Sequence, residues 1–296
     1  MEKPYLLHLI TSEKNASPFD VNMAYDAGWT NITPYTNVEQ SEIQTLVQDT
    51  IFSRSTSALT KTGIFFGGRD THEAMDMIEE VKKHMVPPFE VSVFADPSGA
   101  FTTAAGMVAI TEKHLKDKFS QNLDKSNVVI LGGTGPVGVA SAVICAKAGA
   151  NVTLVGRSLE KAEKIAGICN DRYNSKNVKG GADADKSDFF NAADIVLNTG
   201  AAGIQLMSEE HIKNSNTLKI CADTNAVPPS GIAGVDVMDN GKVIDMSPSK
   251  CLGIGALAIG NIKYKSQHEC LKLMYTSEKP VYLDFEDAFK FAQKSV

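Results

Sequence analysis

The stretch that decides the fold covers residues 127–157 and reads "NVVILGGTGPVGVASAVICAKAGANVTLVGR". An apolar strand at 128–131 is followed by the pattern Gly133-x-Gly135-x-x-Gly138, a helical segment and a second apolar strand at 152–155. A strand, a glycine-rich turn, a helix and a second strand in this order form the βαβ unit of Rossmann-type domains. The complete unit is far more specific than the glycine pattern alone, and it predicts dinucleotide binding.

Each glycine of this pattern has an expected role. Gly133 allows the tight turn, Gly135 lets a pyrophosphate approach the backbone, and Gly138 lets the helix pack on the strand. The helix N-terminus offers free N–H groups and a positive dipole to the phosphates. The residues of the loop that we expect to bind the cofactor are Gly133, Thr134, Gly135, Pro136, Val137 and Gly138.

The end of the second strand predicts which dinucleotide binds. NAD-binding units carry an Asp or Glu there, about 20 residues after the glycines, which accepts hydrogen bonds from the ribose. Here Arg157 stands 19 positions after Gly138, and the first carboxylate is Glu160. A guanidinium matches a phosphate with paired hydrogen bonds, so Arg157, helped by Ser158 and Lys161, is predicted to bind the 2′-phosphate of NADP. The alternative is a solvated Arg157 that stacks on adenine and permits NAD as well.

The first half of the chain alternates strands with helices. Strands are expected at 5–10, 31–36, 63–66 and 89–95, and helices at 18–28, at 40–51, after residue 68 and after residue 100. The third helix has an apolar stripe at Ala74, Ile78, Val81 and Met85, which is spaced as one helix face requires. Four consecutive β-then-α units predict a mostly parallel sheet covered by helices.

We therefore predict an α/β protein of two domains. An N-terminal α/β domain that holds the substrate is expected at 1–124, and a Rossmann-type NADP-binding domain at 125–270. The polar segment at 116–127 is interpreted as the boundary between them. A C-terminal helical segment at 271–296 could pack back on the N-terminal domain.

Composition excludes several classes of partner. The net charge is -6, from 29 basic and 35 acidic residues without a basic cluster, which argues against nucleic acid or an anionic membrane surface. No stretch approaches the roughly 20 apolar residues of a membrane span, and the apolar run near the N-terminus is too short for a signal peptide. We expect a cytoplasmic protein that acts on a small molecule.

Cysteine and histidine patterns point away from disulfides and metals. Five cysteines are an odd number, scattered through mostly apolar runs, so they are interpreted as reduced core thiols: Cys145, Cys169, Cys221, Cys251 and Cys270. The six histidines include no pair at helical ligand spacing, and CxxC does not occur. No metal site is expected.

Substrate contacts are expected in two later segments, 217–236 and 251–265. Both lie past the fourth and fifth candidate strands, and loops at the carboxyl ends of strands meet the nicotinamide half of the cofactor. Their polar residues are Asp223, Asn225 and Lys263, and Asn225 is predicted to bind substrate. For Lys263 alone, an ordinary exposed lysine is the alternative.

Longer motifs carry a family resemblance. The segments "SPFDVNMAYDAGWTNITPY", "TTAAGMVA", "GGTGPVGVASA", "VGRSLEKA", "ADTNAVPPSGIAGVD" and "GALAIGNIKYK" occur in order over nearly the whole chain. In this the chain resembles the bacterial NAD(P)-dependent methylene-tetrahydromethanopterin dehydrogenases. The resemblance implies hydride transfer from methylene-tetrahydromethanopterin, or in some members methylene-tetrahydrofolate, to NADP or NAD in the one-carbon metabolism of formaldehyde oxidation and methylotrophy. It also implies a homo-oligomer built on trimers.

The resemblance assigns roles to single residues. The family's important lysine falls on Lys263 and its N-terminal aspartate on Asp20, which we take as the catalytic residues. A pterin-binding loop that usually reads Asp-Ser-Asn-Gly-x-Asn-Thr-Thr here reads "DPSGAFTT", from residue 96 to residue 103. Thr102 and Thr103 are retained as substrate-binding residues, but two amides are missing. The choice between tetrahydromethanopterin and tetrahydrofolate therefore stays open.

Two other functions are alternatives. A short-chain dehydrogenase would use a Tyr-x-x-x-Lys pair, which Tyr275 and Lys279 superficially offer. Pro280 disfavours a helix that continues through Lys279. In addition, a short-chain dehydrogenase would begin close to its glycine pattern, whereas about 125 residues precede the pattern in this chain. A non-catalytic NADP-binding sensor is the second alternative, and only an assay of turnover separates it from an enzyme.

Overall fold

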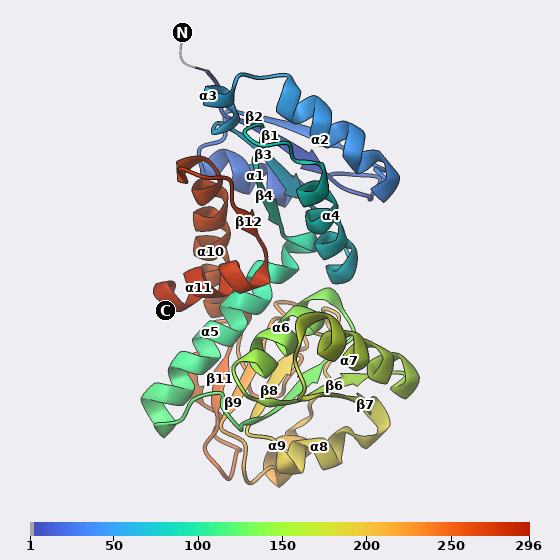
Figure 1. Ribbon diagram of the computed structural model, residues 1–296. Helices are drawn as coiled ribbons and strands as arrows, with labels where there is room; N and C mark the ends of the chain where they lie inside the picture. The colour runs from blue at the N-terminus through green and yellow to red at the C-terminus, as the bar shows by residue number, and fades with distance from the viewer. Residues whose placement is uncertain (1–2) are drawn as a thin grey trace. The chain divides into compact units, whose positions relative to one another are not determined.

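The computed structural model describes residues 3–296, and contacts within the chain divide them into two compact units. The first unit comprises residues 3–102 and Tyr264–Phe291, and the second comprises Thr103–Lys263 and Ala292–Val296. Each has its own sheet of mainly parallel strands with helices (Figure 1), so the predicted α/β fold with two domains is confirmed. The predicted domain limits at 124 and 270 stay a prediction.

The first unit is built on a five-stranded sheet in the order β12-β4-β3-β1-β2, with every pairing parallel. Its strands are β1 (Leu6–Ile10), β2 (Asn31–Tyr35), β3 (Thr62–Phe66), β4 (Ser92–Ala95) and β12 (Tyr282–Leu283). Its helices are α1 (Pro18–Asp26), η1 (Gln40–Glu42), α2 (Ile43–Phe52), α3 (Thr56–Leu59), α4 (Thr71–His84) and η2 (Pro97–Gly99), with the start of α5 (Ala100–Phe119), the end of α10 (Ala256–Thr276) and most of α11 (Phe285–Ser295). Because β12 pairs with β4, a C-terminal strand completes the N-terminal sheet.

Helix α4 shows how local sequence sets an element of this unit. Asp70 caps its N-terminus, and the Asp70 carboxylate accepts two backbone N–H bonds of the first turn. Of the predicted apolar stripe, Ala74, Ile78 and Val81 are buried within the helix, and Met85 is buried at its C-cap. The stripe predicted from spacing is thus confirmed.

Two limits differ from the sequence-based expectation. The strand expected at 89–95 begins only at Ser92, because residues 86–89 turn back on themselves in an isolated antiparallel bridge. The polar segment expected to separate the domains at 116–127 starts inside a helix, since α5 continues to Phe119. The polar residues at the start of this segment form the exposed end of α5, because their helix propensity is sufficient to continue the helix.

The second unit is built on a seven-stranded sheet in the order β10-β11-β9-β8-β5-β6-β7. All pairings are parallel except that of the edge strand β10 with β11. Its strands are β5 (Asn127–Leu131), β6 (Asn151–Gly156), β7 (Val178–Ala182), β8 (Ile195–Asn198), β9 (Ile220–Asp223), β10 (Asn240–Val243) and β11 (Leu252–Ile254). Its complete helices are α6 (Pro136–Lys147), α7 (Leu159–Tyr173), η3 (Asp183–Asp185), α8 (Lys186–Ala192) and α9 (Glu209–Asn214).

The strand order places a ligand site in this unit. From β5 the chain moves outward through β6 and β7, then returns to the other side of β5 as β8. The carboxyl ends of β5 and β8 therefore flank a topological switch point, where open α/β sheets bind ligands. Beneath it, Val129, Leu131, Val155 and Val196 belong to one buried apolar cluster, so the strand ends are held by a packed core.

All five cysteines are buried free thiols, as the apolar runs around them predict. Burial raises the pKa of Cys145 and of Cys169 to about 12, which keeps both sulfurs protonated at neutral pH. Within residues 3–296 no cluster of three or more potential metal-ligating side chains occurs. None of the helices over the same residues is both long and apolar enough to span a bilayer.

Candidate functional site

The glycine loop between β5 and α6 shows why each glycine is needed. The left-handed backbone of the turn falls on Gly132, with φ +66°, and not on Gly133, which the sequence pattern singles out. Gly133 is required instead for space, because a Cβ there would lie 2.8 Å from the Ile130 carbonyl oxygen. A Cβ on Gly138 would lie 2.6 Å from the Cα of Gly133, which confirms that Gly138 permits close packing of the helix.

Gly135 differs from the other glycines of the loop. Among the described residues, a Cβ on Gly135 would meet only the Gly132 carbonyl oxygen, at the ordinary contact distance of 3.4 Å, and its φ is -87°. Neither packing nor backbone conformation therefore demands a glycine here. Because Gly135 lines a cavity, the space beside its Cα is space for a ligand.

That cavity lies at the carboxyl ends of four neighbouring strands, β7, β6, β5 and β8. Its volume is about 430 Å³, within the range of roughly 300–1,000 Å³ that is typical of small-molecule sites. It is lined by Gly132, Thr134, Gly135, Val155, Gly156, Arg157, Asp183, Thr199, Gly200, Ala201, Ile204 and Leu206. Of the predicted cofactor residues, Thr134, Gly135 and Arg157 are among them.

The first turn of α6 begins beside this cavity, directly after Gly135, and carries backbone N–H donors. Gly135 is the N-cap and Pro136 occupies the first helical position, where its missing N–H is no loss. The earliest residue of the helix that donates back to the loop is Val139, to the Gly135 carbonyl oxygen. The N–H groups of Val137 and Gly138 precede it in a turn that has no intrahelical acceptors, so they can bind an anion. The loop and the helix thus fit a pyrophosphate.

The cationic end of the cavity is formed by the residues that follow β6. Arg157 is exposed and lines the cavity, and over residues 3–296 its guanidinium has no ion-pair partner. Ser158 is the N-cap of α7, and its Oγ accepts the N–H of Lys161 at 3.3 Å. A hydroxyl that accepts a bond still has its own hydrogen to donate. Ser158 can therefore cap the helix and donate to a phosphate at once.

Sequence reasoning did not single out nine of the twelve described residues of the cavity wall. Asp183 follows β7, and Thr199, Gly200 and Ala201 follow β8. The signal that could have found them is their position directly after buried strands, since carboxyl ends of parallel strands meet at one edge. This signal was weak for Asp183, because the preceding strand β7 reads "VKGGA" and glycine is rare in strands, so β7 itself is hard to recognise in the sequence.

The predicted pterin loop of the first unit is organised by Asp96, which is fully buried. Its Oδ1 accepts the backbone N–H groups of Phe101 (2.8 Å) and Thr102 (3.1 Å), and its Oδ2 accepts the Thr102 hydroxyl at 2.6 Å. Thr102 is therefore committed to the loop's own structure. Thr103, the following residue of α5, is half-buried, and contact of either threonine with substrate stays a prediction.

Asp20 lies in the first turn of α1 and is only 4% exposed. Gln267 is fully buried, and its Nε2 donates to Asp20 Oδ1 at 3.5 Å. A Cβ on Gly67, directly after β3, would lie 3.7 Å from Asp20 Oδ2. The carboxylate thus sits at the carboxyl edge of the five-stranded sheet, where parallel α/β folds place functional groups.

Asn225 lies in the loop after β9 and is 7% exposed. Its Oδ1 accepts the N–H groups of Gly203 (3.2 Å) and Val227 (2.9 Å), and its Nδ2 donates to the Pro229 carbonyl at 2.8 Å. Three of its four hydrogen-bonding positions therefore hold the loop together. One N–H remains for the predicted contact with substrate.

Lys263 is a half-buried residue of α10. In the second unit the backbone of this helix packs very closely on α5, because a Cβ on Gly106 would lie 3.0 Å from the Lys263 nitrogen and from the Ile259 carbonyl oxygen. The close contact at Gly106 therefore fixes the position of the Lys263 backbone along the axis of α5. A catalytic role of Lys263 stays a prediction.

The Tyr-Lys pair of a short-chain dehydrogenase is not formed by the described residues. The Tyr275 hydroxyl donates to the Ala27 carbonyl oxygen at 2.7 Å, which gives it a structural partner. Helix α10 ends at Thr276, so Lys279 lies outside the helix that would have to present both residues.

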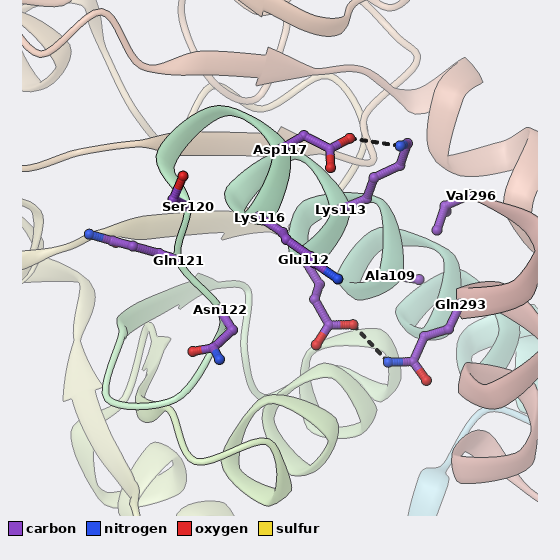
Figure 2. Close-up of a pocket in the computed structure, with 10 residues that line it drawn as sticks. All are labelled: Ala109, Glu112, Lys113, Lys116, Asp117, Ser120, Gln121, Asn122, Gln293 and Val296. Carbon is purple, nitrogen blue, oxygen red and sulfur yellow. Dashed lines mark hydrogen bonds and ion pairs between the residues drawn. The ribbon is translucent and has the colours of Figure 1, made fainter.

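A larger cavity of about 860 Å³ lies elsewhere in the second unit, along α5 and the C-terminal residues (Figure 2). Three of its four charged side chains already have partners: Lys113 pairs with Asp117 at 2.8 Å, and Gln293 donates to Glu112 at 2.7 Å. The described residues that line it include no glycine and no helix N-terminus. The smaller cavity at the switch point is therefore the better candidate site.

The fold and this cavity define a two-unit α/β protein with a Rossmann-type dinucleotide site. Residues 18–98 match the family described as methylene-tetrahydromethanopterin dehydrogenase, N-terminal. The chain is 42% identical over 290 residues to the NAD(P)-dependent methylenetetrahydromethanopterin dehydrogenase of Methylorubrum extorquens, covering 97% of each chain. It belongs to this family of dehydrogenases, which confirms the resemblance of its motifs.

Two further comparisons agree with this. The bifunctional protein MdtA of the same organism is 35% identical over 291 residues, covering 98% of each chain. Quinate dehydrogenase from Corynebacterium glutamicum, solved in complex with NAD, has a similar structure with a TM-score of 0.57 over 99% of each chain. At 13% identity the latter similarity shows the shared fold alone.

Proposed function

We propose that this protein oxidises methylenetetrahydromethanopterin to its methenyl form by transferring a hydride to NADP⁺. The observation that carries the proposal is the 42% identity over 97% of the chain to an enzyme with that name. The glycine loop, the helix N-terminus and Arg157 supply a cavity that fits a phosphorylated dinucleotide. The substrate places the reaction in one-carbon metabolism, with formaldehyde oxidation in methylotrophs as its setting.

NADP is the expected cofactor, with NAD as a second one. Arg157 faces the cavity where NAD-binding units place a carboxylate, and a guanidinium recognises a phosphate by paired hydrogen bonds. The Ser158 hydroxyl and Lys161 lie beside it on the first turn of α7. Gly133, Thr134, Gly135, Pro136, Val137 and Gly138 would hold the pyrophosphate.

The chemistry asks little of the protein. The methylene carbon lies between two nitrogens whose lone pairs stabilise the cation that remains after hydride leaves, so no strong base is needed. When bound, the nicotinamide ring supplies the hydride acceptor. The chain's own residues have to bind both molecules in register and exclude water from the reacting atoms.

Two residues are assigned to the pterin. Asp20, buried at the edge of the first sheet, stabilises the positive charge that develops on the pterin ring. Lys263 donates a hydrogen bond to a pterin carbonyl and orients the ring, because a cation beside the reacting carbon would oppose the charge being formed. Thr102, Thr103 and Asn225 complete the proposed substrate site.

The preferred pterin is decided by the measurement that also tests the function. The experiment compares kcat/KM for the four combinations of NADP or NAD with methylenetetrahydromethanopterin or methylenetetrahydrofolate, followed by nicotinamide absorbance. We expect the highest value for NADP with the methanopterin. Dinucleotide binding without reduction by either pterin would contradict the proposal and favour an NADP-binding sensor.

We further propose that the enzyme works in the cytoplasm as a homo-oligomer built on trimers. Five buried free thiols suit a reducing compartment, and the family resemblance supplies the trimer. Light scattering coupled to size-exclusion chromatography measures the mass directly, against 31.8 kDa for one chain. A monomer would overturn the assembly without affecting the proposed reaction.

A further inference from the structure

We propose that Asp183 recognises the 6-amino group of the adenine ring and so makes the dinucleotide site specific for adenine. The inference rests on the proposed function only in that the second unit binds a nicotinamide dinucleotide. It concerns a residue that the sequence patterns did not single out.

The position of Asp183 follows from the order of the strands. β5, β6 and β7 are neighbours, and their carboxyl ends carry the glycine loop, Arg157 and Asp183 in that order along one cavity. In Rossmann-type units the pyrophosphate lies on the glycine loop and the adenosine ribose at the end of the second strand. The base, attached to the ribose on the side away from the pyrophosphate, then extends toward the end of β7.

Asp183 is chemically suited to an amino group. Of the described residues that line the cavity it is the one carboxylate, and it can only accept hydrogen bonds when ionised. Its Oδ1 accepts the Lys186 ammonium at 3.0 Å, which fixes the carboxylate and leaves Oδ2 to bind a ligand. The 6-amino group of adenine is a donor, whereas hypoxanthine and guanine present a carbonyl oxygen there.

A different effect of the same carboxylate would be repulsion of the 2′-phosphate bound by Arg157. Lys186 opposes that reading, because its ammonium offsets the charge of Asp183 within hydrogen-bonding distance. The Lys186 side chain is 19% exposed and that of Asp183 is 42% exposed, so the pair is held at the surface of the unit with the carboxylate more open. Base recognition predicts that a substitution of Asp183 affects the binding of NADP and NAD alike, whereas phosphate repulsion predicts an effect on NADP alone. Measurements with both dinucleotides therefore separate the two effects.

The test measures dissociation constants by calorimetry for NADP, NAD and their two hypoxanthine analogues, without pterin. The variants are Asp183→Asn, which keeps the shape of the side chain, and Asp183→Ala. Asp185→Asn is the matched control, since Asp185 is an exposed carboxylate of the same 3-10 helix that does not line the cavity.

We expect the wild type and Asp185→Asn to bind the adenine forms about tenfold more tightly than the hypoxanthine forms, the effect of one charge-assisted hydrogen bond at a partly exposed site. Both Asp183 variants should reduce this ratio to about twofold or less, with NADP and NAD alike. Equal ratios in wild type and variants, or a change confined to NADP, would overturn the inference. A wild type that discriminates the bases but never reduces NADP with pterin would refute the proposed function and leave the role of Asp183 standing.

Discussion

Gly135 and Gly138, three residues apart in one loop, should respond to alanine in opposite ways. In Gly138→Ala the new methyl carbon would lie 2.6 Å from the Gly133 Cα, whereas carbon atoms in contact are normally about 3.5–4.0 Å apart. Relieving this overlap of about 1 Å requires a shift of α6 or of the loop, and overpacking of this kind destabilises by about 1–3 kcal/mol or more. For a unit of this size, the melting temperature should fall by roughly 2–4 °C per kcal/mol.

In Gly135→Ala the methyl group meets no atom of the described residues closer than 3.4 Å, so the melting temperature should stay within about 2 °C of wild type. The methyl group occupies the space at the helix N-terminus that a pyrophosphate needs. Each charge-assisted bond to a backbone N–H that is lost removes about 1.5–3 kcal/mol, so Kd for NADP should rise by roughly 10–100-fold.

The assay combines differential scanning calorimetry of both variants with titration of NADP. Binding near the wild-type Kd in Gly135→Ala would show that the cavity is not the dinucleotide site. A Gly138→Ala variant as stable as wild type would refute the packing argument. The two variants control for each other, because one changes binding in an intact fold and the other changes the fold.

Three other predictions test single groups. Arg157→Ala should raise KM for NADP about 10–100-fold through loss of charge-assisted bonds and leave KM for NAD within about twofold; equal effects on both would make Arg157 an ordinary surface residue. Burial raises the pKa of Asp284 from 3.8 to about 6, so ionising it opposes folding. The free energy of unfolding is then greatest at a pH below the pKa of Asp284 in the unfolded chain. It falls as the pH rises through about 4–6, and above pH 6 it is about 3 kcal/mol lower. Asp284→Asn should therefore raise the melting temperature near pH 8 and leave it nearly unchanged near pH 4, and a variant destabilised at both would contradict this sign. Lys263→Ala should lower kcat/KM with either pterin by at least about tenfold while Kd for NADP is unchanged, and near-normal kcat and KM would remove Lys263 from the site.

Patterns that depend on near neighbours in the chain predicted the fold well. The apolar stripe of α4 and the glycine loop both follow from spacing over fewer than about 15 residues, and both are confirmed. The early start predicted for β4 failed because the pairing of Val86 with Phe89 is a turn that hydrophobicity does not reveal. The participation of β12 in the first sheet depends on a pairing across nearly 190 positions, which no local pattern encodes.

The candidate site was predicted only where a single motif contains it. The loop and Arg157 lie within one βαβ unit, so spacing alone brought them together. Asp183 and Thr199 join the cavity through the order of four strands, and that order is set by the return of β8 to the far side of β5. The sequence shows that a residue follows a strand. It does not show which residues of the adjacent strands lie beside it at the carboxyl edge of the sheet.

The predicted pterin loop shows how this chain accommodates its two departures from the family pattern. Asp96 bonds the backbone N–H of residue 101, not its side chain, so the loop tolerates Phe101 in place of an amide. The Phe101 ring packs edge-on against Phe285, with centroids 5.1 Å apart, and both side chains are fully buried. Ser98 has a left-handed backbone, with φ +54°, which asparagine adopts readily, and its Oγ donates to the Gly68 carbonyl oxygen at 2.8 Å. Both missing amides are thus replaced by interactions within the first unit. We therefore expect a difference in pterin preference, if one is measured, to reflect hydrogen bonds that the two amides would make directly to the pterin.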